Sequence, residues 1–403
     1  MARARIRAYT GTVRIGIALF LARRSLGESL LSTALMIVAV AVGIGFQVPS
    51  TANLRGYRAE LLAQSLDAGF GDVRVRPKRG LYLHGADALA ARLSHLSGVA
   101  AATPVIGAVA STMANGRSSG VTVLGVDPQS AYHPYRVVAG NPLDDSNDTV
   151  LLGVSVADRL GVAVGDRIEL RVLLSSYPRL VLDDGGYGVY TMTIRGLVGF
   201  GASDGAFVGR SFLAGEVGDE QLASAILIHT PHHEAAAALA AAVSRVVPSL
   251  LVRPWIDDSR YLRSSVRAVE TLASASWLMG VLAVGIPVLA LLYISTLHRR
   301  RQIGLLTAMG FSRLDLFASF LAQALILGLA GAVAGGVVAV ALVRYLIWHP
   351  IFDWQAFVIR PVLPWSDLAR TIGVVILTAV VAGTYPAWRA ARLDPSPILR
   401  GIE

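Results

Sequence analysis

Four long apolar runs without a charged residue constrain this chain more than any other feature of its sequence. They occupy residues 29–54, 271–297, 316–343 and 371–388. A helix needs about 17–25 consecutive, mostly apolar residues to cross the hydrocarbon core of a bilayer. Every run reaches that length, so we predict a polytopic membrane protein with four spanning helices.

The composition agrees with spanning segments. Hydrophobic residues make up 54% of the 403 residues and charged residues only 16%, whereas about a quarter of a soluble protein is charged. The net charge of +9 comes from arginine, because Lys78 is the only lysine. These arginines cluster beside the apolar runs, which membrane topology explains, so we expect no nucleic-acid partner. The chain has no cysteine, which excludes disulfides and thiolate chemistry.

The basic residues predict the side of the membrane on which each segment lies. Arginine is in excess in three segments, 1–28, 298–315 and 389–403. Such segments stay in the cytoplasm, and four spans place all three on one side. We therefore predict a cytoplasmic N-terminus with an amphipathic elbow helix, a cytoplasmic coupling loop and a cytoplasmic tail. Residues 55–270 then form a large extracytoplasmic domain, and residues 344–370 form a short external loop.

The segment 55–270 alternates between strand and helix patterns. Residues 121–128 and 192–200 have the pattern of strands, 148–172 that of strand, helix and strand, and 232–247 that of a helix. A further helix and strand precede them. We therefore predict a mixed α+β domain with room for two lobes.

No catalytic or metal site is expected in this domain. His232, His233 and Glu234 superficially resemble metal ligands, but adjacent residues do not share one face of a helix. No G-x-S-x-G nucleophile motif occurs. The phosphate-binding pattern G-x-x-x-x-G-K-[ST] is also absent, since Lys78 lies in the segment RPKRG. We therefore expect a chain that is not an enzyme and has no cofactor of its own, with ATP hydrolysis on a separate subunit.

Small residues in the third run leave two interpretations open. Gly328, Gly331, Gly335 and Gly336 form a stripe that allows close contact between helices. The stripe is either a seam between two subunits or a site of ordinary packing within the chain.

Two cytoplasmic segments carry a family resemblance. The loop has a basic run followed by I-G-L-L-x-A-x-G, with Arg301, Gln302, Ile303, Gly304, Leu305, Leu306, Ala308, Met309 and Gly310. The tail has P-A-x-R-A-A-R-L-D-P, with Pro386, Arg389, Arg392, Leu393, Asp394 and Pro395. Both resemble the FtsX-like/MacB-type permeases of ABC transporters, most closely the lipoprotein-releasing (LolC/LolE-like) branch. The loop departs from the family pattern at Gln302, where an acidic residue is usual, and at Thr307, where a basic one is common.

The resemblance implies a fold, partners and a mechanism. The fold is four transmembrane helices with an external α+β domain of the MacB-type periplasmic core. The partners are two P-loop ATPase subunits, which hold ATP and Mg²⁺, and a second permease copy or a homologous permease. The loop would be the coupling helix that docks on the ATPase. Independently, Ile303, Leu306 and Met309 recur at i and i+3 and predict a short helix with an apolar face, which could instead pack on the membrane or on the chain's own bundle.

Three functions stay open for such a permease of the bacterial inner membrane. The first is extraction of lipoproteins, or another lipidic substrate, from the outer leaflet. The lipid would lie between the spans near the outer surface, where the candidate residues are Phe46, Val48, Trp277 and Met279. The alternatives are efflux of small molecules or peptides with a periplasmic adaptor, and signalling to a cell-wall hydrolase. An ion-coupled carrier is not expected, because the spans hold no acidic residue or histidine at mid-depth.

Overall fold

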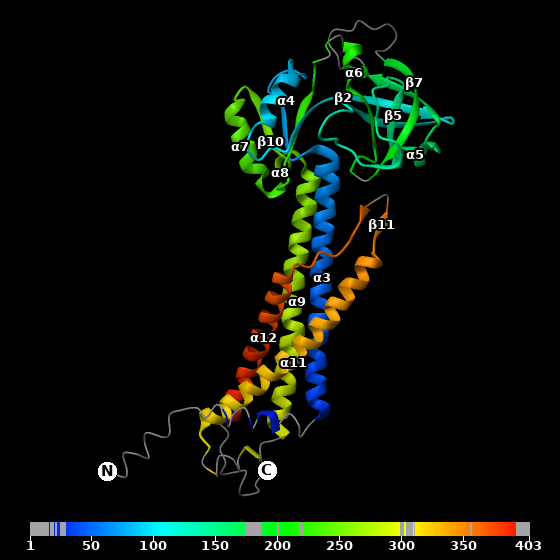
Figure 1. Ribbon diagram of the computed structural model, residues 1–403. Helices are drawn as coiled ribbons and strands as arrows, with labels where there is room; N and C mark the ends of the chain where they lie inside the picture. The colour runs from blue at the N-terminus through cyan, green and yellow to red at the C-terminus, as the bar shows by residue number, and fades with distance from the viewer. Residues whose placement is uncertain are drawn as a thin grey trace. The chain divides into compact units, whose positions relative to one another are not determined.

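The computed structural model describes residues 16, 20, 22–24, 30–173, 187–199, 201–217, 219, 221–298, 302–303, 309, 311–354 and 357–391. The chain divides into two compact units (Figure 1). The helical unit comprises residues 1–56, 269–350 and 360–403, and the α/β unit comprises residues 57–268 and 351–359.

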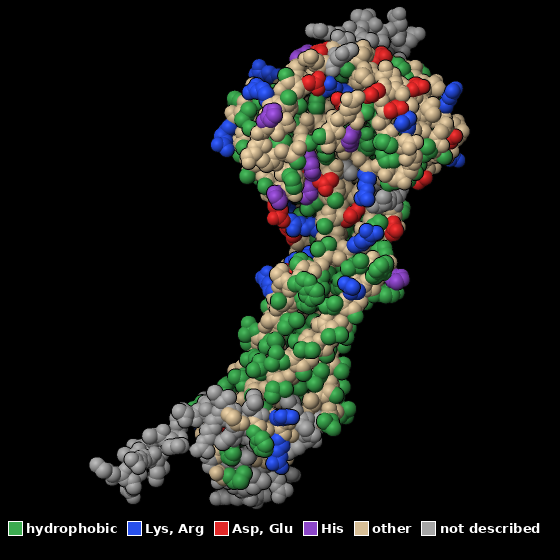
Figure 2. All heavy atoms as spheres, in the orientation of Figure 1, with side chains coloured by type: hydrophobic (Ala, Val, Ile, Leu, Met, Phe, Trp, Pro, Cys, Tyr) green, Lys and Arg blue, Asp and Glu red, His purple; other side chains and the backbone are tan. Residues whose placement is uncertain are grey.

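Four helices in the described part of the chain are long and apolar enough to cross a membrane. They are α3 (Leu30–Leu62), α9 (Arg260–His298), α11 (Arg313–Trp348) and α12 (Trp365–Ala391). Hydrophobic side chains gather over the surface of the helical unit in Figure 2, as lipid-facing helices require. The prediction of four spanning helices is confirmed. Three of them begin before their apolar runs, α9 at Arg260, α11 at Arg313 and α12 at Trp365, because polar turns extend each helix.

A capping box fixes the start of α11. The Ser312 side-chain oxygen accepts a hydrogen bond from the Asp315 N–H at 3.1 Å, and the Asp315 carboxylate accepts one from the Ser312 N–H at 3.2 Å. The box satisfies two backbone donors at a helix start, where the first N–H groups have no partner within the helix. The loop between α9 and α11 therefore ends at a defined residue.

The glycine stripe of α11 packs within the chain. An added Cβ on Gly331 would lie 2.5 Å from Cβ of Val40 on α3, and one on Gly335 would lie 2.9 Å from Cα of Ala41. Gly328 faces α12 in the same way. Such contacts need a residue without a side chain, because helix backbones approach closely there. The structure therefore favours intrachain packing over a seam between subunits.

A ten-stranded mixed sheet forms the α/β unit. Its strands are β1 (Val73–Pro77), β2 (Ala101–Ala114), β3 (Arg117–Val126), β4 (Val137–Gly140), β5 (Thr149–Gly153), β6 (Arg167–Leu173), β7 (Tyr187–Val198), β8 (Gly205–Gly209), β9 (Ala225–His229) and β10 (Leu250–Pro254). Their order is β10-β1-β9-β2-β3-β8-β5-β7-β4, and β6 pairs with β2 and β7. The β3–β8 and β5–β7 pairs are parallel.

Helices cover this sheet over two hydrophobic cores. They are η1 (Ala63–Phe70), α4 (Ala86–Ser94), α5 (Val154–Leu160), α6 (Arg210–Val217), η3 (His233–Ala235), α7 (Ala236–Val246) and α8 (Trp255–Asp258). One core contains buried residues of α4 and α7, and the other contains buried residues of α5 and α6. The long strand β2 joins them, because its first residues pair with β9 and its later residues with β6. The predicted α+β class is confirmed, and the two lobes share one sheet.

A short hairpin from the predicted external loop belongs to the α/β unit. Its strands are β11 (Asp353–Trp354) and β12 (Phe357–Val358). The Phe357 side chain is 3% exposed, and its ring centroid lies 5.7 Å from that of Tyr57 in an edge-on contact. Burial of this aromatic ring explains why the segment 351–359 joins the domain rather than forming a free loop.

Candidate functional site

The loop between α9 and α11 contacts the bundle through Ile303, one of the few residues of the loop that the structure describes. Ile303 is 3% exposed and packs with Leu316 and Phe320 of α11 and with Ala387 of α12. Met309, six residues further along, is 69% exposed. Burial of an isoleucine side chain stabilises such a contact by about 1.5–3 kcal/mol. The two apolar positions predicted for one helix face therefore have different surroundings.

The structure describes only part of the predicted coupling segment. Gln302 is exposed and next to the buried Ile303. The other predicted coupling residues lie outside the described residues: Arg301, Gly304, Leu305, Leu306, Ala308 and Gly310.

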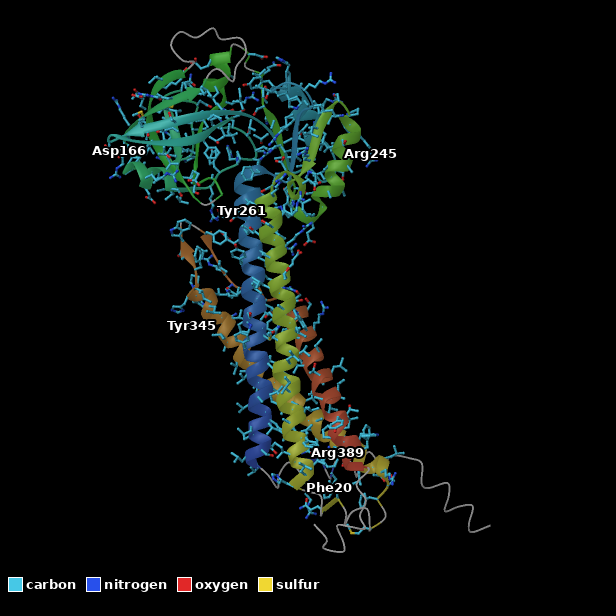
Figure 3. The ribbon with its side chains drawn as sticks, turned by 180° about the vertical axis from the view of Figure 1, so that it is seen from behind. Phe20, Asp166, Arg245, Tyr261, Tyr345 and Arg389 are labelled. Carbon is cyan, nitrogen blue, oxygen red and sulfur yellow. The ribbon has the colours of Figure 1, made fainter. Side chains whose placement is uncertain are left out.

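The tail motif ends α12 with an aromatic and cationic cluster. The guanidinium carbon of Arg389 lies 5.1 Å from the centroid of the Tyr293 ring on α9. Its NH1 group donates a hydrogen bond to the Tyr385 hydroxyl at 3.4 Å, and the Tyr293 and Tyr385 rings stack with centroids 6.4 Å apart. Pro386 is buried beside them. Figure 3 shows Arg389 in the last turns of α12.

The rest of the tail motif, Arg392, Leu393, Asp394 and Pro395, lies outside the described residues.

The opposite end of the bundle, where α12 begins, contains a small cavity of about 30 Å³. Val48 and Trp277 line it together with Arg55, Asp367 and Arg370. Arg55 and Asp367 form an ion pair between α3 and α12. The guanidinium carbon of Arg370 lies 5.7 Å from the centroid of the Trp277 ring. Charged and apolar side chains thus meet at one end of the spanning helices.

Only two of the four predicted substrate residues meet in this cavity. Val48 is 1% exposed in the bundle core, and Trp277 is half-buried. Phe46 and Met279 are 69% and 64% exposed on the surface of the helical unit. A period of 3.6 residues explains the difference, because Phe46 and Val48 lie on different faces of one helix.

The segment that leads into α12 contacts α3 next to this cavity. The Val362 N–H donates a hydrogen bond to the Ala52 carbonyl at 3.0 Å. An added Cβ on Gly56 would clash with the carbonyl oxygen of Arg360. The connection to α12 therefore crosses α3 at a residue that must lack a side chain.

A buried carboxylate organises one end of β9 in the α/β unit. The Asp72 side chain is fully buried. One of its oxygens lies 2.7 Å from Nδ1 of His233, and the other lies 3.2 Å from Nδ1 of His229 and accepts a hydrogen bond from the Thr230 N–H at 2.8 Å. The carboxylate of Asp67 lies 3.6 Å from Nε2 of His233. Two histidines and two carboxylates therefore form one cluster of titratable side chains.

The cluster shifts the pKa values of its members. Burial raises the pKa of Asp72, but contacts with His229, His233 and the Thr230 N–H outweigh burial and leave that pKa below its usual value. The hydrogen bond to Asp72 raises the pKa of His233 above its usual value, against the opposing effect of burial. Each partner thus stabilises the charged form of the other.

Sequence reasoning did not find this cluster. Asp72 and His233 are separated by 161 positions, and no local pattern links them. His232, its neighbour in the sequence, is exposed. The described residues contain no group of three or more His, Cys, Asp and Glu side chains arranged to hold a metal ion.

Comparisons with known proteins match most of the chain. The model of the MacB-like periplasmic core domain matches residues 33–246, which is more than half of the chain, and the model of the FtsX-like permease C-terminal region matches residues 238–395. The two matches overlap at residues 238–246, and together they cover the α/β unit and nearly all of the four spanning helices.

Several curated proteins are similar to this chain. A macrolide export ATP-binding/permease protein MacB from Shewanella sp. (strain ANA-3) is 24% identical over 98% of this chain and 61% of its own length. Another from Aeromonas hydrophila is 28% identical over 91% of this chain and 56% of its own length. An uncharacterized ABC transporter permease from Methanocaldococcus jannaschii is 26% identical over 40% of this chain and 42% of its own. The chain thus spans about half of the length of these relatives.

Proposed function

Because this chain belongs to the family of ABC transporter permeases with an FtsX-like C-terminal region and a MacB-like periplasmic core domain, we propose that it carries ATP-driven motion across the membrane to its extracytoplasmic domain. The arrangement of Ile303 and Met309 carries this proposal. Ile303 fixes the cytoplasmic loop to two spanning helices, so a displacement of the loop acts directly on α11 and α12. Met309 leaves an apolar side chain exposed in the same loop for a partner.

The partner is a P-loop ATPase that binds ATP and Mg²⁺, and two copies serve a pair of permeases. Two relatives are named ATP-binding/permease proteins, and this chain spans 61% and 56% of their lengths. The phosphate-binding pattern does not occur in this sequence. We propose a separate subunit as the site of hydrolysis, and a second permease that is another copy of this chain or a homologue.

The substrate is lipidic, either a lipoprotein or another amphiphile from the outer leaflet of the bacterial inner membrane. Trp277 supports this proposal, because it is half-buried at the end of the bundle with the guanidinium carbon of Arg370 5.7 Å from its ring centroid. A cation at the edge of an apolar site suits a molecule with a hydrocarbon chain and an acidic head. Phe46 and Met279 would face the surrounding lipid.

A second candidate is efflux of a small molecule through a periplasmic adaptor. The relatives support it, because two that align with more than nine tenths of this chain carry the printed name of macrolide exporters. The two candidates share the ATPase and the motion of the external domain. They differ in the partner that receives the substrate.

The test is purification of the tagged chain from its native membrane in mild detergent, with mass spectrometry of every co-purifying protein. A P-loop ATPase with acylated lipoproteins supports lipid extraction, whereas an ATPase with an adaptor or outer-membrane channel supports efflux. An ATPase with a wall hydrolase would replace both by signalling. Absence of any ATPase, under conditions that keep a known ABC complex intact, would contradict the proposed function.

A further inference from the structure

A groove of about 780 Å³ lies over one face of the sheet in the α/β unit. Side chains of η1, β1, β2, β3, β8, β9 and the first turn of α9 line it, all within that unit. Sites for small organic ligands usually enclose about 300–1,000 Å³. The groove is therefore large enough for a ligand and is separate from the small cavity among the spanning helices.

The floor of the groove is apolar across neighbouring strands. Val105 of β2, Phe207 of β8 and Leu227 of β9 are 2%, 5% and 3% exposed. Leu124 of β3 lies between them, because it pairs with Gly107 on one side and with Phe207 on the other. The register thus places a continuous strip of hydrocarbon under the groove.

Large apolar side chains also stand at its edge. Phe70, Leu81 and Tyr261 line the groove with 48%, 60% and 65% of their surfaces exposed. Figure 3 shows Tyr261 at the start of α9. Exposed apolar groups around a hollow are typical of binding sites, because a soluble surface otherwise avoids such patches.

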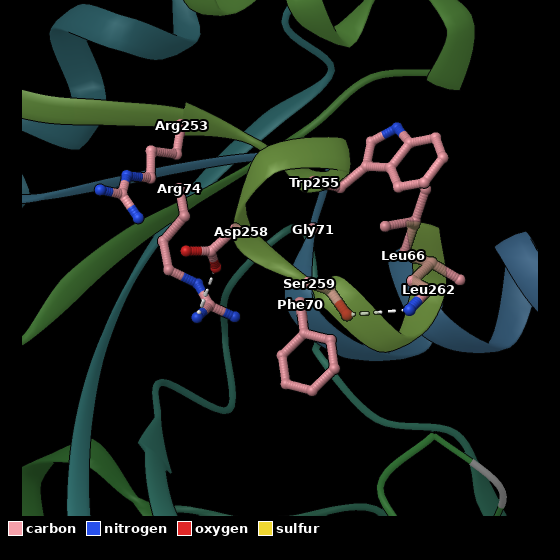
Figure 4. Close-up of a pocket in the computed structure, with 9 residues that line it drawn as sticks. All are labelled: Leu66, Phe70, Gly71, Arg74, Arg253, Trp255, Asp258, Ser259 and Leu262. Carbon is pink, nitrogen blue, oxygen red and sulfur yellow. Dashed lines mark hydrogen bonds and ion pairs between the residues drawn. The ribbon is translucent and has the colours of Figure 1, made fainter. Parts of the chain in front are cut away.

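One end of the groove is basic. Arg74 and Arg76 of β1 both line it and share one carboxylate, with nitrogen–oxygen distances of 2.8 Å and 3.6 Å to Asp258. Arg253 of β10 is the cross-strand partner of Arg74. Figure 4 shows Arg74 and Arg253 on adjacent strands and Asp258 beside Arg74. The two guanidinium groups that line the groove therefore share one carboxylate, with a third guanidinium next to them on β10.

Arg74 contacts Asp258 and lies over the Phe70 ring at 5.1 Å, yet one of its nitrogen atoms is unsatisfied. Its Nε atom is buried and has no hydrogen-bond partner within the described part of the chain. Burial lowers the pKa of Arg74, and the carboxylate of Asp258 offsets this effect in part. A buried cation without full compensation is costly. The carboxylate in the groove lining, on Asp204, is paired with Arg159 at 3.0 Å.

We propose that this groove binds an amphiphile with one hydrocarbon chain and an acidic head group. The chain lies along Val105, Leu124 and Leu227, and the head group pairs with Arg74 and Arg76. An uncharged apolar ligand, such as a peptide segment, would leave the net positive charge of Arg74, Arg76 and Asp258 without a counter-ion. That the groove binds a transported substrate rests on the proposed function. Binding of an amphiphile requires only the external domain.

The test uses the full chain in nanodiscs and a saturated fatty acid that carries a diazirine near the end of its chain. After irradiation, mass spectrometry of the peptides locates the attached probe. The proposal expects labels in β2, β3 and β9, in addition to those that lipid contact produces in the spanning helices. Excess palmitate should remove the labels in the strands, and the same concentration of palmityl alcohol should leave most of them.

Two variants, each with a matched control, test whether side chains of the groove hold the probe. Arg76→Gln should weaken labelling of the groove about tenfold, which corresponds to about 1.4 kcal/mol. Arg171→Gln is its control, because both arginine side chains are 44% exposed and ion-paired but Arg171 lies on β6 outside the groove. Leu124→Gln should have a similar effect, with Leu197→Gln on β7 as the control, because both leucines are partly buried against a core and Leu197 lies outside the groove.

Three outcomes would overturn the inference. They are labels confined to the spanning helices, equal competition by the acid and the alcohol, and labelling of the groove that Arg76→Gln and Leu124→Gln leave unchanged. None of these bears on whether an ATPase co-purifies with the chain. Failure of the groove can therefore be distinguished from failure of the proposed function.

Discussion

Arg389 of α12 and Tyr293 of α9 form a cation–π contact in which the guanidinium carbon lies 5.1 Å from the ring centroid. The contact connects the last turn of α12, which carries the tail motif, to the end of the helix that leads into the predicted coupling loop. A cation over an aromatic ring at an exposed site contributes about 0.5–1 kcal/mol. The family tail motif thus has a physical role in holding two spanning helices together.

We expect Arg389→Ala to weaken this connection. The thermal unfolding midpoint of the purified chain should fall by a few degrees at most, and stimulation of the partner ATPase by the permease should fall more clearly. Arg389→Lys keeps a cation over the ring and should retain most of both properties. Equal ATPase stimulation by the Ala variant and the native chain would show that the contact takes no part in coupling.

Substitutions of Ile303 and Met309 should have different effects on the stability of the chain and on its association with the ATPase. Ile303→Ala removes a buried side chain from its cluster with Leu316 and Phe320 and should cost about 2 kcal/mol of stability, at the low end of such substitutions. Met309→Ala removes an exposed side chain and should change stability by less than about 0.5 kcal/mol. Yet it should weaken association with the ATPase. Thermal unfolding and pull-down of the ATPase, measured on both variants, check the contrast.

The spanning helices could be predicted because insertion into a bilayer depends on the hydrophobicity of about 20 consecutive residues, which is a local property of the sequence. The surroundings of Ile303 and Met309 could not, because a spacing of i and i+3 describes one helix face but not what covers it. Ile303 is buried by residues of α11 and α12 that are distant in the sequence. The groove could not be predicted from the sequence for the same reason, because the residues that line it come from five strands.

The cluster around Asp72 should make stability depend on pH. The folded pKa of His233 is raised, so its contribution is fully present below its unfolded pKa of about 6.5 and is lost as pH rises through the folded value. The folded pKa of Asp72 is lowered, so its contribution is present above about pH 4 and is lost as pH falls through the folded value. Stability from the pair is therefore greatest between about pH 4 and 6.5.

His233→Asn should abolish most of the decline in thermal midpoint above pH 6.5 and should lower the midpoint at pH 6. His232→Asn is the control, because this neighbouring histidine is exposed. An unchanged pH profile in His233→Asn would contradict the assigned coupling between His233 and Asp72.

Gly331 provides a test of intrachain packing in the third span. Gly331→Ala would place a Cβ 2.5 Å from Cβ of Val40, and overpacking of this kind costs about 1–3 kcal/mol. The control is Gly373→Ala on α12, where an added Cβ has no neighbour within 4 Å. We expect a lower thermal midpoint for the first variant only. If Gly331→Ala instead leaves stability intact but dissociates a dimer, the stripe is a seam between subunits.

The absence of cysteine from the sequence allows a direct test of topology. A membrane-impermeant maleimide should label Val189→Cys, on exposed β7 of the α/β unit, in intact spheroplasts. It should label Met309→Cys only after the membrane is opened. The reverse pattern would invert the orientation derived from the positions of the arginines.

The most direct test of the permease account is a cross-link from the coupling loop. Met309→Cys, modified with a photoreactive maleimide in native membranes, should form an adduct with a P-loop ATPase, identified by mass spectrometry of the adduct. Met279→Cys is the matched control, because Met279 is similarly exposed, at 64% against 69%, but lies in a spanning helix. An ATPase adduct at position 309 and not at 279 is the predicted result. No ATPase adduct at position 309, or equal adducts at both positions, would contradict docking of an ATPase on this loop.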